Sequence, residues 1–167
     1  MALGEGELYA CYRRLETPLY NVLYRWLWQA QDCQDVIHDA FVRVWDRRAR
    51  VDAARLDALV WTTALNLARN RLRWRALWRF GEIDPLAAAD TDPFADAARG
   101  LQQRRLRDAL AQLPRAMRDV LVLAEFGGLG NAEIAAVLGI PAGTVGSRRH
   151  QALARLRGLL KEEHADE

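Results

Sequence analysis

Long hydrophobic runs and cysteines are scarce in this 167-residue chain, and each scarcity excludes a class of protein. No apolar stretch approaches the roughly 20 residues that a membrane-spanning helix requires. The segment from Met1 to Glu7 contains acids and no basic residue ahead of an apolar segment, which is not the pattern of a secretory signal. We therefore expect neither a membrane span nor an export signal.

Clusters of cysteine and histidine are also missing. Cys11 and Cys33 are the two cysteines and the three histidines are scattered, so neither a disulfide framework nor a structural zinc site is expected. The sequence contains no phosphate-binding loop of the G-x-x-x-x-G-K type and no G-x-S-x-G nucleophile elbow. We expect a protein of the reducing cytoplasm with no catalytic residues, no metal and no cofactor.

Arginine supplies almost all of the positive charge, since 23 arginines accompany a single lysine, Lys161. Arginine suits phosphate and base recognition better than lysine does, although the codon usage of a GC-rich genome produces the same bias. The formal net charge of +2 hides an uneven distribution. Residues 43–80 hold ten arginines and three aspartates, whereas residues 81–98 hold five acids, two prolines and no basic residue, which is typical of a linker.

Helical periodicity dominates the rest of the chain, because few segments alternate apolar and polar residues and no Asn-Gly or Asp-Gly hairpin turn occurs. We expect the first helix to bend near Pro18 and the second to open with Asp32 as its N-cap. The predicted helices are 8–27, 32–46, 56–79, 101–113, 114–126, 132–138 and 142–161. The sequence thus predicts an all-α protein in which two small helical domains, 1–80 and 99–162, are joined by a flexible acidic linker over residues 81–98.

The helix from Asp32 to Asp46 carries an acidic stripe on its outward side. The residues predicted on this stripe are Asp35, His38, Asp39, Val42 and Asp46. Such a stripe is either a solvated face or a docking surface for a basic partner, and the residues alone leave both interpretations open.

The helix over residues 56–79 combines aromatic and basic residues. Its predicted core face is Leu56, Leu59, Val60, Thr63, Ala64, Leu67 and Trp74, and the opposite stripe is Thr62, Asn66, Arg69, Asn70 and Arg73. Trp61, Trp74 and Trp78 alternate with arginines, a combination that can hold single-stranded bases by stacking beside a positive groove. The alternative is that the tryptophans belong to the core and the arginines form a solvated face.

Residues 131–157 have the arrangement of a helix-turn-helix, in which a short helix and a glycine-containing turn precede a longer helix that enters the DNA major groove. The residues expected to hold the two helices together are Ile134, Val137, Leu138, Ile140 and Val145. On the second helix, Thr144, Ser147, Arg148, Gln151 and Arg155 share one face and are types that bind phosphates and base edges. A helical hairpin with a solvated outer face is the alternative.

Three motifs, in order along the chain, carry a resemblance to a known family. Asp32 to Trp45 resembles sigma region 2.2, and Leu59 to Arg73 resembles regions 2.3 and 2.4. Leu113 to Arg148, with its Leu-Pro start and its Leu-Gly-Ile-Pro turn, resembles region 4. The chain, from about Leu8 to Leu160, is therefore similar to the extracytoplasmic-function (group IV) sigma factors, which are specificity subunits of bacterial RNA polymerase.

The resemblance implies a partner for each stripe. The stripe Asp35, His38, Asp39, Val42 and Asp46 would dock on the clamp helices of the largest core polymerase subunit, and the polymerase flap is a further contact. The melted minus-10 element would be bound by the loop from about Arg47 to Leu56 and by the polar face with Asn66 and Asn70. The residues of this site would be Arg50, Arg55, Trp61, Asn66, Arg69, Asn70 and Arg73. The minus-35 duplex would be read by Thr144, Ser147, Arg148, His150, Gln151 and Arg155. The family also implies an anti-sigma factor, encoded separately, as a regulatory partner.

Five residues depart from the family pattern, namely Leu59, Trp61, Gly146, Arg149 and Gln151. Arg149 falls on the inward face of its helix, where its stem can pack while its head reaches solvent.

The main rival interpretation is a stand-alone helix-turn-helix regulator that binds palindromic half-sites as a dimer, and a structural helical adaptor is a third. Neither rival gives a role to the arginines and tryptophans of the first half of the chain.

Overall fold

The computed structural model describes residues 2–78 and 97–165, and every regular element within those two ranges is a helix. The predicted all-α class is therefore confirmed. The chain divides into two compact units, Met1–Asp90 and Thr91–Glu167, and each is described by itself below. The linker predicted over residues 81–98 lies outside the described residues, except that residues 97 and 98 already belong to helix α4.

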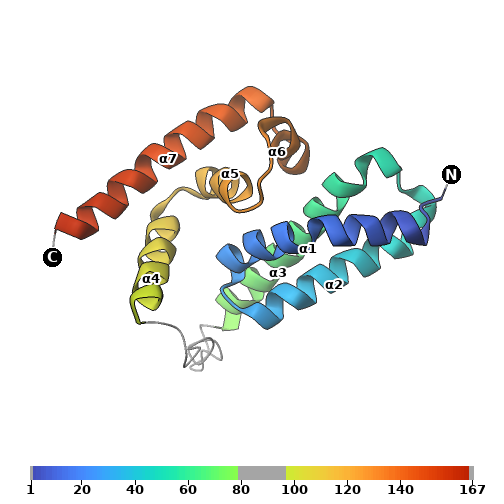
Figure 1. Ribbon diagram of the computed structural model, residues 1–167, viewed down its shortest axis with the longest axis horizontal. Coiled ribbons are helices and arrows are strands. Elements are labelled where there is room, and N and C mark those ends of the chain that lie inside the picture. Colours follow the sequence, from blue (N-terminus) through green and yellow to red (C-terminus); the bar gives the residue numbers. More distant parts are fainter. Residues whose placement is uncertain (1, 79–96, 166–167) are drawn as a thin grey trace. The chain divides into compact units, whose positions relative to one another are not determined.

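Three long helices form the first unit, namely α1 (Glu5–Leu27), α2 (Ala30–Asp46) and α3 (Leu56–Trp78). Two short 3-10 helices, η1 (Arg48–Arg50) and η2 (Ala53–Arg55), connect α2 to α3. Each long helix packs against the other two, as Figure 1 shows. Their shared core includes the fully buried side chains of Leu19, Leu23, Val36, Val60 and Leu65.

Local chemistry sets both ends of α1. At its start, the Glu7 carboxylate accepts a hydrogen bond of 2.9 Å from the backbone N–H of Gly4, and the acidic side chains of the first turn favour the helix dipole. The helix continues through Pro18. At its end, Trp28 adopts a left-handed conformation with φ 57°, and its N–H donates to the Tyr24 carbonyl. This turn leads the chain directly into α2.

The start of α2 differs from the prediction. The helix begins at Ala30, with Gln29 as its N-cap, and Asp32 lies inside the first turn rather than at the cap. The Asp32 carboxylate instead accepts hydrogen bonds from Arg71 and Arg75 of α3. Asp32 was predicted to cap α2, but its carboxylate instead binds two arginines that are distant in the sequence.

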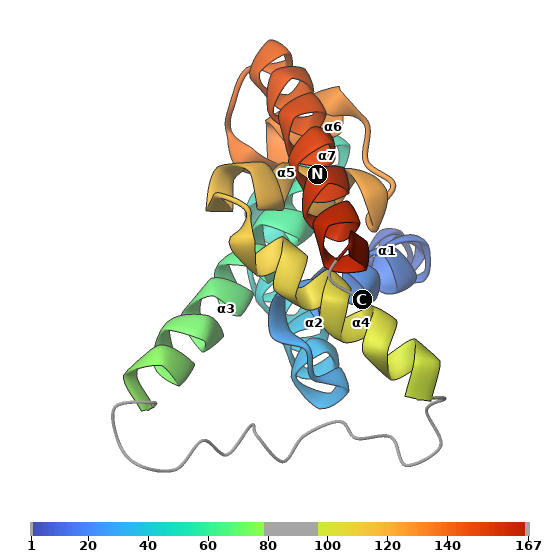
Figure 2. The same cartoon turned by 90° about the vertical axis from the view of Figure 1, so that its left-hand side faces the viewer.

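Helix α3 also differs from the prediction in the residues that it buries. Its buried residues are Leu56, Val60, Trp61, Ala64, Leu65 and Ala68, whereas Leu59, Thr63 and Leu67 are half-buried. Trp74, which was predicted in the core, is 63% exposed. The reason is that Trp74 lies four residues after the exposed Asn70 on the same side of α3, and the last turns of α3 lead away from α1 and α2, as Figure 2 shows.

The second unit consists of α4 (Ala97–Gln112), α5 (Arg115–Glu125), α6 (Asn131–Leu138) and α7 (Ala142–Ala165). Helix α7 packs against each of the other three. The predicted positions of these helices hold to within a few residues. Two helices begin one residue from their predicted starts, because Pro114 is the N-cap of α5 and Gly130 is the N-cap of α6.

A tight turn joins α6 to α7. Gly139 ends α6 in the left-handed region with φ 68°, where glycine avoids the strain of a side chain, and its N–H donates to the Ala135 carbonyl at 2.9 Å. Of the residues predicted to hold the two helices together, Ile134, Val137 and Val145 are buried and Leu138 and Ile140 are half-buried. The helix-turn-helix is therefore present at the predicted residues.

Candidate DNA-binding and docking surfaces

An exposed polar stripe runs along α3. Asn66, Asn70 and Arg73 are exposed and lie at i, i+4 and i+7, so they share one side of the helix, as predicted. Beside this stripe, where α3 faces the end of α2, the surface contains a hollow of about 160 Å³. The hollow is lined by Arg43, Val44, Arg47, Leu59, Thr63, Asn66, Leu67 and Asn70.

Arg43 and Arg47 both line this hollow, and Arg43 is missing from the segments predicted to bind DNA, whereas Arg47 begins the predicted minus-10 loop. They lie four residues apart at the end of α2, and the packing of α2 on α3 brings them into the same hollow as Asn66 and Asn70. Two guanidinium groups and two amides together suit a ligand that carries both a phosphate and a base edge. The i, i+4 spacing of Arg43 and Arg47 at the end of the preceding helix is the signal that could have identified Arg43.

Four of the residues predicted to bind the minus-10 element do not lie on this stripe. Trp61 is only 3% exposed, so the prediction that its ring is available for stacking is wrong, because this side of α3 faces the core. Arg69 turns toward α1, where its guanidinium carbon lies 5.4 Å from the centre of the Trp26 ring. Arg50 and Arg55 are exposed at the ends of η1 and η2, between α2 and α3.

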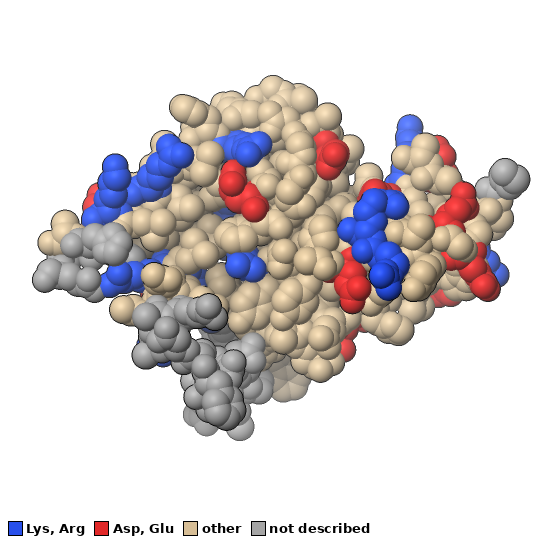
Figure 3. All heavy atoms as spheres, in the orientation of Figure 1, with Lys and Arg blue, Asp and Glu red and all other residues tan. Residues whose placement is uncertain are grey.

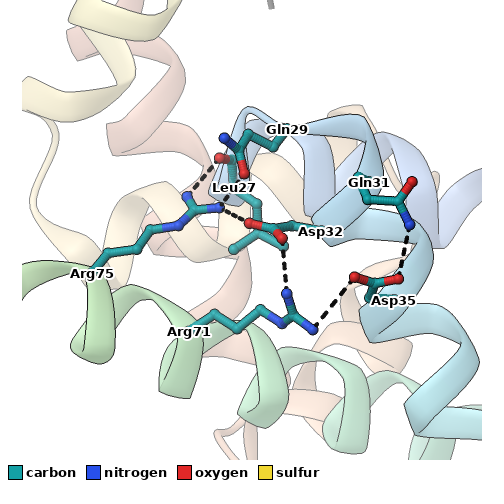
Figure 4. A network of polar contacts seen from close by, with 7 residues as sticks. All are labelled: Leu27, Gln29, Gln31, Asp32, Asp35, Arg71 and Arg75. Atoms are coloured by element: carbon teal, nitrogen blue, oxygen red, sulfur yellow. Dashed lines mark hydrogen bonds and ion pairs between the residues drawn. The ribbon is translucent and has the colours of Figure 1, made fainter. Parts of the chain in front are cut away.

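A network of ion pairs and hydrogen bonds fixes α3 against the start of α2, as Figure 4 shows. The Asp32 carboxylate accepts from Arg71 at 2.8 Å and also from Arg75. Arg75 donates in addition to the Leu27 carbonyl at 2.7 Å and to the side chain of Gln29 at 3.3 Å. Its side chain is 15% exposed. Arg71 and Arg75 therefore hold the helices together, and Asp32 offsets part of their charge.

The acidic stripe of α2 is exposed over most of its length. His38, Asp39, Val42 and Asp46 are exposed, as predicted. Asp35 is half-buried, because its carboxylate accepts from the Gln31 amide at 3.0 Å and lies 3.8 Å from the Arg71 guanidinium. Asp35 is therefore engaged within the unit, and the exposed part of the stripe begins at His38.

A groove between α1 and α2 adjoins this stripe. Its wider part, about 570 Å³, is lined by residues that include Ile37 and His38, and a more apolar part of about 370 Å³ is lined by residues that include Phe41 and Trp45. Tyr12 lines both parts. The other lining residues are Glu5, Leu8, Tyr9, Glu16, Thr17, Tyr20 and Gln34. An apolar floor with acidic edges suits an amphipathic helix that carries basic residues.

The residues predicted to read the minus-35 duplex lie on α7. Ser147, His150, Gln151 and Arg155 are exposed, and Thr144 and Arg148 are half-buried. Figure 3 shows basic side chains spaced along α7 on the face turned to the viewer. Exposed polar side chains on the second helix of a helix-turn-helix are the arrangement that reads base edges in the major groove.

Comparison with known proteins decides the family. Residues 11–78 match Sigma-70 region 2, and residues 103–156 match Sigma-70, region 4. The ECF RNA polymerase sigma factor RpoE of Cereibacter sphaeroides is 34% identical over 134 residues, which cover 77% of this chain and 71% of RpoE. The chain belongs to the extracytoplasmic-function (ECF) sigma factors.

Solved structures agree with this sigma-factor assignment. The structure of CnrH in complex with the cytosolic domain of CnrY is 27% identical, with a TM-score of 0.71, and the match covers 93% of this chain and 88% of CnrH. The sigma factor RpoE of Bartonella quintana, in complex with the anti-sigma factor NepR, has the same fold, with a TM-score of 0.65 at 20% identity. That match covers 94% of this chain and 96% of the Bartonella quintana RpoE chain.

The two matched regions separate a sigma factor from the rival interpretations. The region 2 match spans most of the three-helix unit, which a stand-alone helix-turn-helix regulator lacks. The region 4 match spans the helix-turn-helix. The predicted function as an RNA polymerase sigma factor is therefore confirmed. Within the described ranges of this sigma factor, no helix combines the length and the apolar character that crossing a membrane demands.

The structure explains one departure of this sigma factor from the family pattern, the arginine at position 149. Arg149 lies on the inward side of α7, and its guanidinium donates to the Glu125 carboxylate at 3.1 Å. Its side chain is 37% exposed, so the stem packs while the head group reaches the surface, as expected. Glu125 is the last residue of α5, and the ion pair therefore joins α5 to α7.

Proposed function

We propose that this sigma factor directs core RNA polymerase to promoters and assists melting of the minus-10 element, and that two faces of its first unit do separate work. The observation that carries the proposal is the exposed stripe of Asn66, Asn70 and Arg73 beside the hollow that Arg43 and Arg47 line. Amides and guanidiniums on a rigid helix suit the edges and phosphates of unpaired nucleotides.

Melting needs no covalent chemistry from this chain. Unpairing and flipping a base costs a few kcal/mol. A surface that binds the strand only when it is unpaired shifts the equilibrium toward the open state by its difference in affinity for the two states. In this proposal Asn66 and Asn70 contact base edges, while Arg43, Arg47 and Arg73 contact phosphates. The exposed Arg50 and Arg55, between α2 and α3, extend the same basic surface. The protein acts as a binding subunit and not as an enzyme.

The other face of the first unit docks on the polymerase. The stripe from His38 to Asp46 combines exposed acids with Val42, which is 42% exposed, and it adjoins the apolar groove between α1 and α2. The clamp helices of the largest subunit are the proposed occupant, with basic side chains facing Asp39 and Asp46. Asp35 contributes less, because its carboxylate is shared with Gln31 and Arg71.

The second unit reads duplex DNA in this proposal. Helix α7 enters the major groove of the minus-35 element, with Ser147, Gln151 and Arg155 toward base edges and phosphates, and with Thr144, Arg148 and His150 beside them. The polymerase flap is the proposed protein contact of this unit.

A separately encoded anti-sigma factor is the proposed regulator. The support comes from the similar structure of RpoE, which was solved with the anti-sigma factor NepR, and from CnrH, which was solved with the cytosolic domain of another protein. Because the chain works on RNA polymerase, we place its action in the bacterial cytoplasm.

Assembly with core polymerase tests the proposal. The chain is mixed with purified bacterial core enzyme, and co-elution is measured by size-exclusion chromatography. We expect the wild-type chain to co-elute, and Asp39→Arg to lose most of the complex. Asp108→Arg makes the same charge change at an exposed position of α4 and serves as the matched control, which should co-elute normally. Failure of the wild-type chain to bind core polymerase would overturn the proposal.

A further inference from the structure

The end of α3 carries three exposed apolar residues for which the proposed function has no use. Trp74, Leu77 and Trp78 are 63%, 64% and 66% exposed. They lie at i, i+3 and i+4, so they gather on one side of the helix. Figure 2 shows that this end of α3 extends past the α1–α2 turn. Large apolar side chains that gather on an exposed surface mark an interaction site, because their hydration is unfavourable.

This apolar group continues the polar stripe in register. Trp74 lies four residues after Asn70, Leu77 lies four residues after Arg73, and Trp78 lies four residues after Trp74. Side chains four residues apart in a helix follow one another along the same side, with an axial separation of about 6 Å. A ligand that runs along the polar stripe therefore meets Trp74 next and Trp78 after it.

The charge around these rings favours an anionic ligand. Asp57 is the one acidic residue in the sequence of α3, whereas Arg69, Arg71, Arg73 and Arg75 all lie within five residues of Trp74. Arg71 and Arg75 are engaged with Asp32, and Arg73 is exposed between Asn70 and Trp74. A ligand with negative charges and flat apolar rings complements both the guanidinium and the indoles, and single-stranded nucleic acid has both features.

We propose that Trp74 and Trp78 form a stacking platform for unpaired nucleotides of DNA, which begins one helical turn beyond Asn70. The proposal rests on the proposed function, since it extends the minus-10 surface along the same helix. The spacing favours unpaired strands, because helix positions four residues apart are separated by about 6 Å along the axis, whereas stacked bases in a duplex strand repeat every 3.4 Å or so. Leu77 fills the apolar surface between the platform and Arg73.

Binding of the full-length chain to a labelled oligothymidylate tests the platform, with a duplex of equal length as the second probe. Fluorescence anisotropy at low ionic strength measures both affinities. Trp74→Ala and Trp78→Ala should each weaken binding of the oligothymidylate by roughly five-fold or more, which is the lower end of one stacked base, and should leave duplex binding unchanged. Trp74→Phe keeps an aromatic face and should retain most of the affinity.

Leu101→Ala is the control, because Leu101 is a large apolar side chain of α4 in the second unit with 49% exposure. It should leave both affinities unchanged. Far-ultraviolet circular dichroism checks that each variant is folded. Binding of the oligothymidylate should also quench tryptophan emission, and Trp74→Ala should remove part of this quenching.

Three results would overturn the platform. The first is wild-type affinity in both tryptophan variants, and the second is an equal loss on the single strand and the duplex. The third is a wild-type dimer that Trp74→Ala dissociates without changing oligothymidylate affinity, because the rings then serve a second copy of the chain. If Asn70→Ala weakens single-strand binding while the tryptophan variants do not, the platform fails and the proposed function stands. Co-elution with core polymerase is independent of every one of these results.

Discussion

At the scale of single residues, Cys11 is fully buried where α1 meets the start of α3, and its thiol lies 3.4 Å from a carboxylate oxygen of Asp57. Burial, followed by the hydrogen bond to Asp57, raises the pKa of the Cys11 thiol to about 12. The thiolate is the reactive form of cysteine, so this residue is a structural core residue rather than an oxidant sensor.

We expect Cys11 to resist alkylation in the folded protein. In a Cys33→Ala chain, iodoacetamide at neutral pH should modify Cys11 slowly under native conditions and rapidly in denaturant, because only unfolding removes the burial that disfavours the thiolate. Mass spectrometry over time measures the modified fraction. Rapid modification of the native chain would contradict the buried, protonated thiol.

Asp57 is held by Arg14, whose guanidinium donates to the two carboxylate oxygens at 2.6 Å and 3.2 Å. The hydrogen bonds from Arg14 lower the pKa of Asp57, and burial opposes them. Because the folded-state pKa is the lower one, the stabilisation is present above the unfolded pKa and is lost as the pH falls through the folded pKa. The pair is half exposed, so its contribution is small.

Asp57→Asn should therefore lower the free energy of unfolding by at most about 1 kcal/mol at neutral pH. The difference from the wild-type chain should be smaller at about pH 2 than at pH 7, because protonation of Asp57 removes the ion pair. Urea titrations followed by tryptophan fluorescence measure it. This signal reports the first unit, since all six tryptophans lie between Trp26 and Trp78. An equal difference at both pH values would contradict an electrostatic origin.

Trp61 was predicted to be available for stacking and is buried, whereas Trp74 was predicted in the core and is exposed. These two residues show what a sequence can and cannot predict about single side chains. Helical periodicity identified the polar stripe of Asn66, Asn70 and Arg73 correctly, because the stripe depends only on positions along one helix. Which tryptophan is covered depends on where α1 and α2 end relative to α3. That is a tertiary property, and it buries Trp61 while it leaves Trp74 exposed.

At the scale of elements, the network around Asp32 sets how α3 meets the α1–α2 turn. Arg75→Ala removes donors to the Leu27 carbonyl, Gln29 and Asp32 at a largely buried position. We expect the free energy of unfolding of the first unit to fall by about 1.5–3 kcal/mol, the range for hydrogen bonds to charged groups. Urea unfolding followed by tryptophan fluorescence measures the loss.

Arg73→Ala is the matched control for this prediction. It removes the same charge from an exposed position two residues away on α3, so the free energy of unfolding should change by no more than about 0.5 kcal/mol. Equal losses in the two variants would show that the network contributes no specific stability.

Gly146 is a glycine inside α7, one turn into the helix that follows the helix-turn-helix turn. A methyl group there would lie 3.5 Å from the Asn131 side-chain nitrogen, which is an ordinary contact. Gly146→Ala should therefore stabilise the second unit by about 0.5–1 kcal/mol, because glycine loses more conformational freedom in a helix than alanine. Thermal unfolding followed by far-ultraviolet circular dichroism measures the gain.

Gly158→Ala provides the comparison for Gly146, since a methyl group at Gly158 meets no atom within 4 Å. Both variants should gain stability by the same mechanism. A gain at Gly158 together with a loss at Gly146 would mean that Asn131 cannot accommodate the methyl group.

The boundaries of the elements were predictable where a local signal sets them. Gly139 ends α6 and α7 begins at Ala142, as the Gly-Ile-Pro turn indicates. The start of α2 was not predictable, because its best capping residue, Asp32, is engaged by Arg71 and Arg75 from a helix some forty residues later. The ion pair of Arg149 with Glu125 was beyond local patterns for the same reason.

At the scale of the whole molecule, the order of three motifs along the sequence predicted the two helical units and the sigma-factor family. The hollow beside Asn66 and Asn70 could not be predicted in the same way, since Arg43 and Arg47 reach it only through the packing of α2 on α3. We propose that the exposed stripe on α2 recruits the polymerase and that the stripe and hollow on α3 bind the melted promoter.

Run-off transcription tests this claim most directly. Purified core polymerase transcribes a fragment that contains the region upstream of the sigma factor's own gene, with the wild-type chain, with Asp39→Arg, with Asn66→Ala/Asn70→Ala, or with no addition. We predict a chain-dependent transcript that Asp39→Arg loses together with core binding, and that Asn66→Ala/Asn70→Ala loses while core binding is retained. Wild-type transcript levels from the Asn66→Ala/Asn70→Ala chain would contradict the claim.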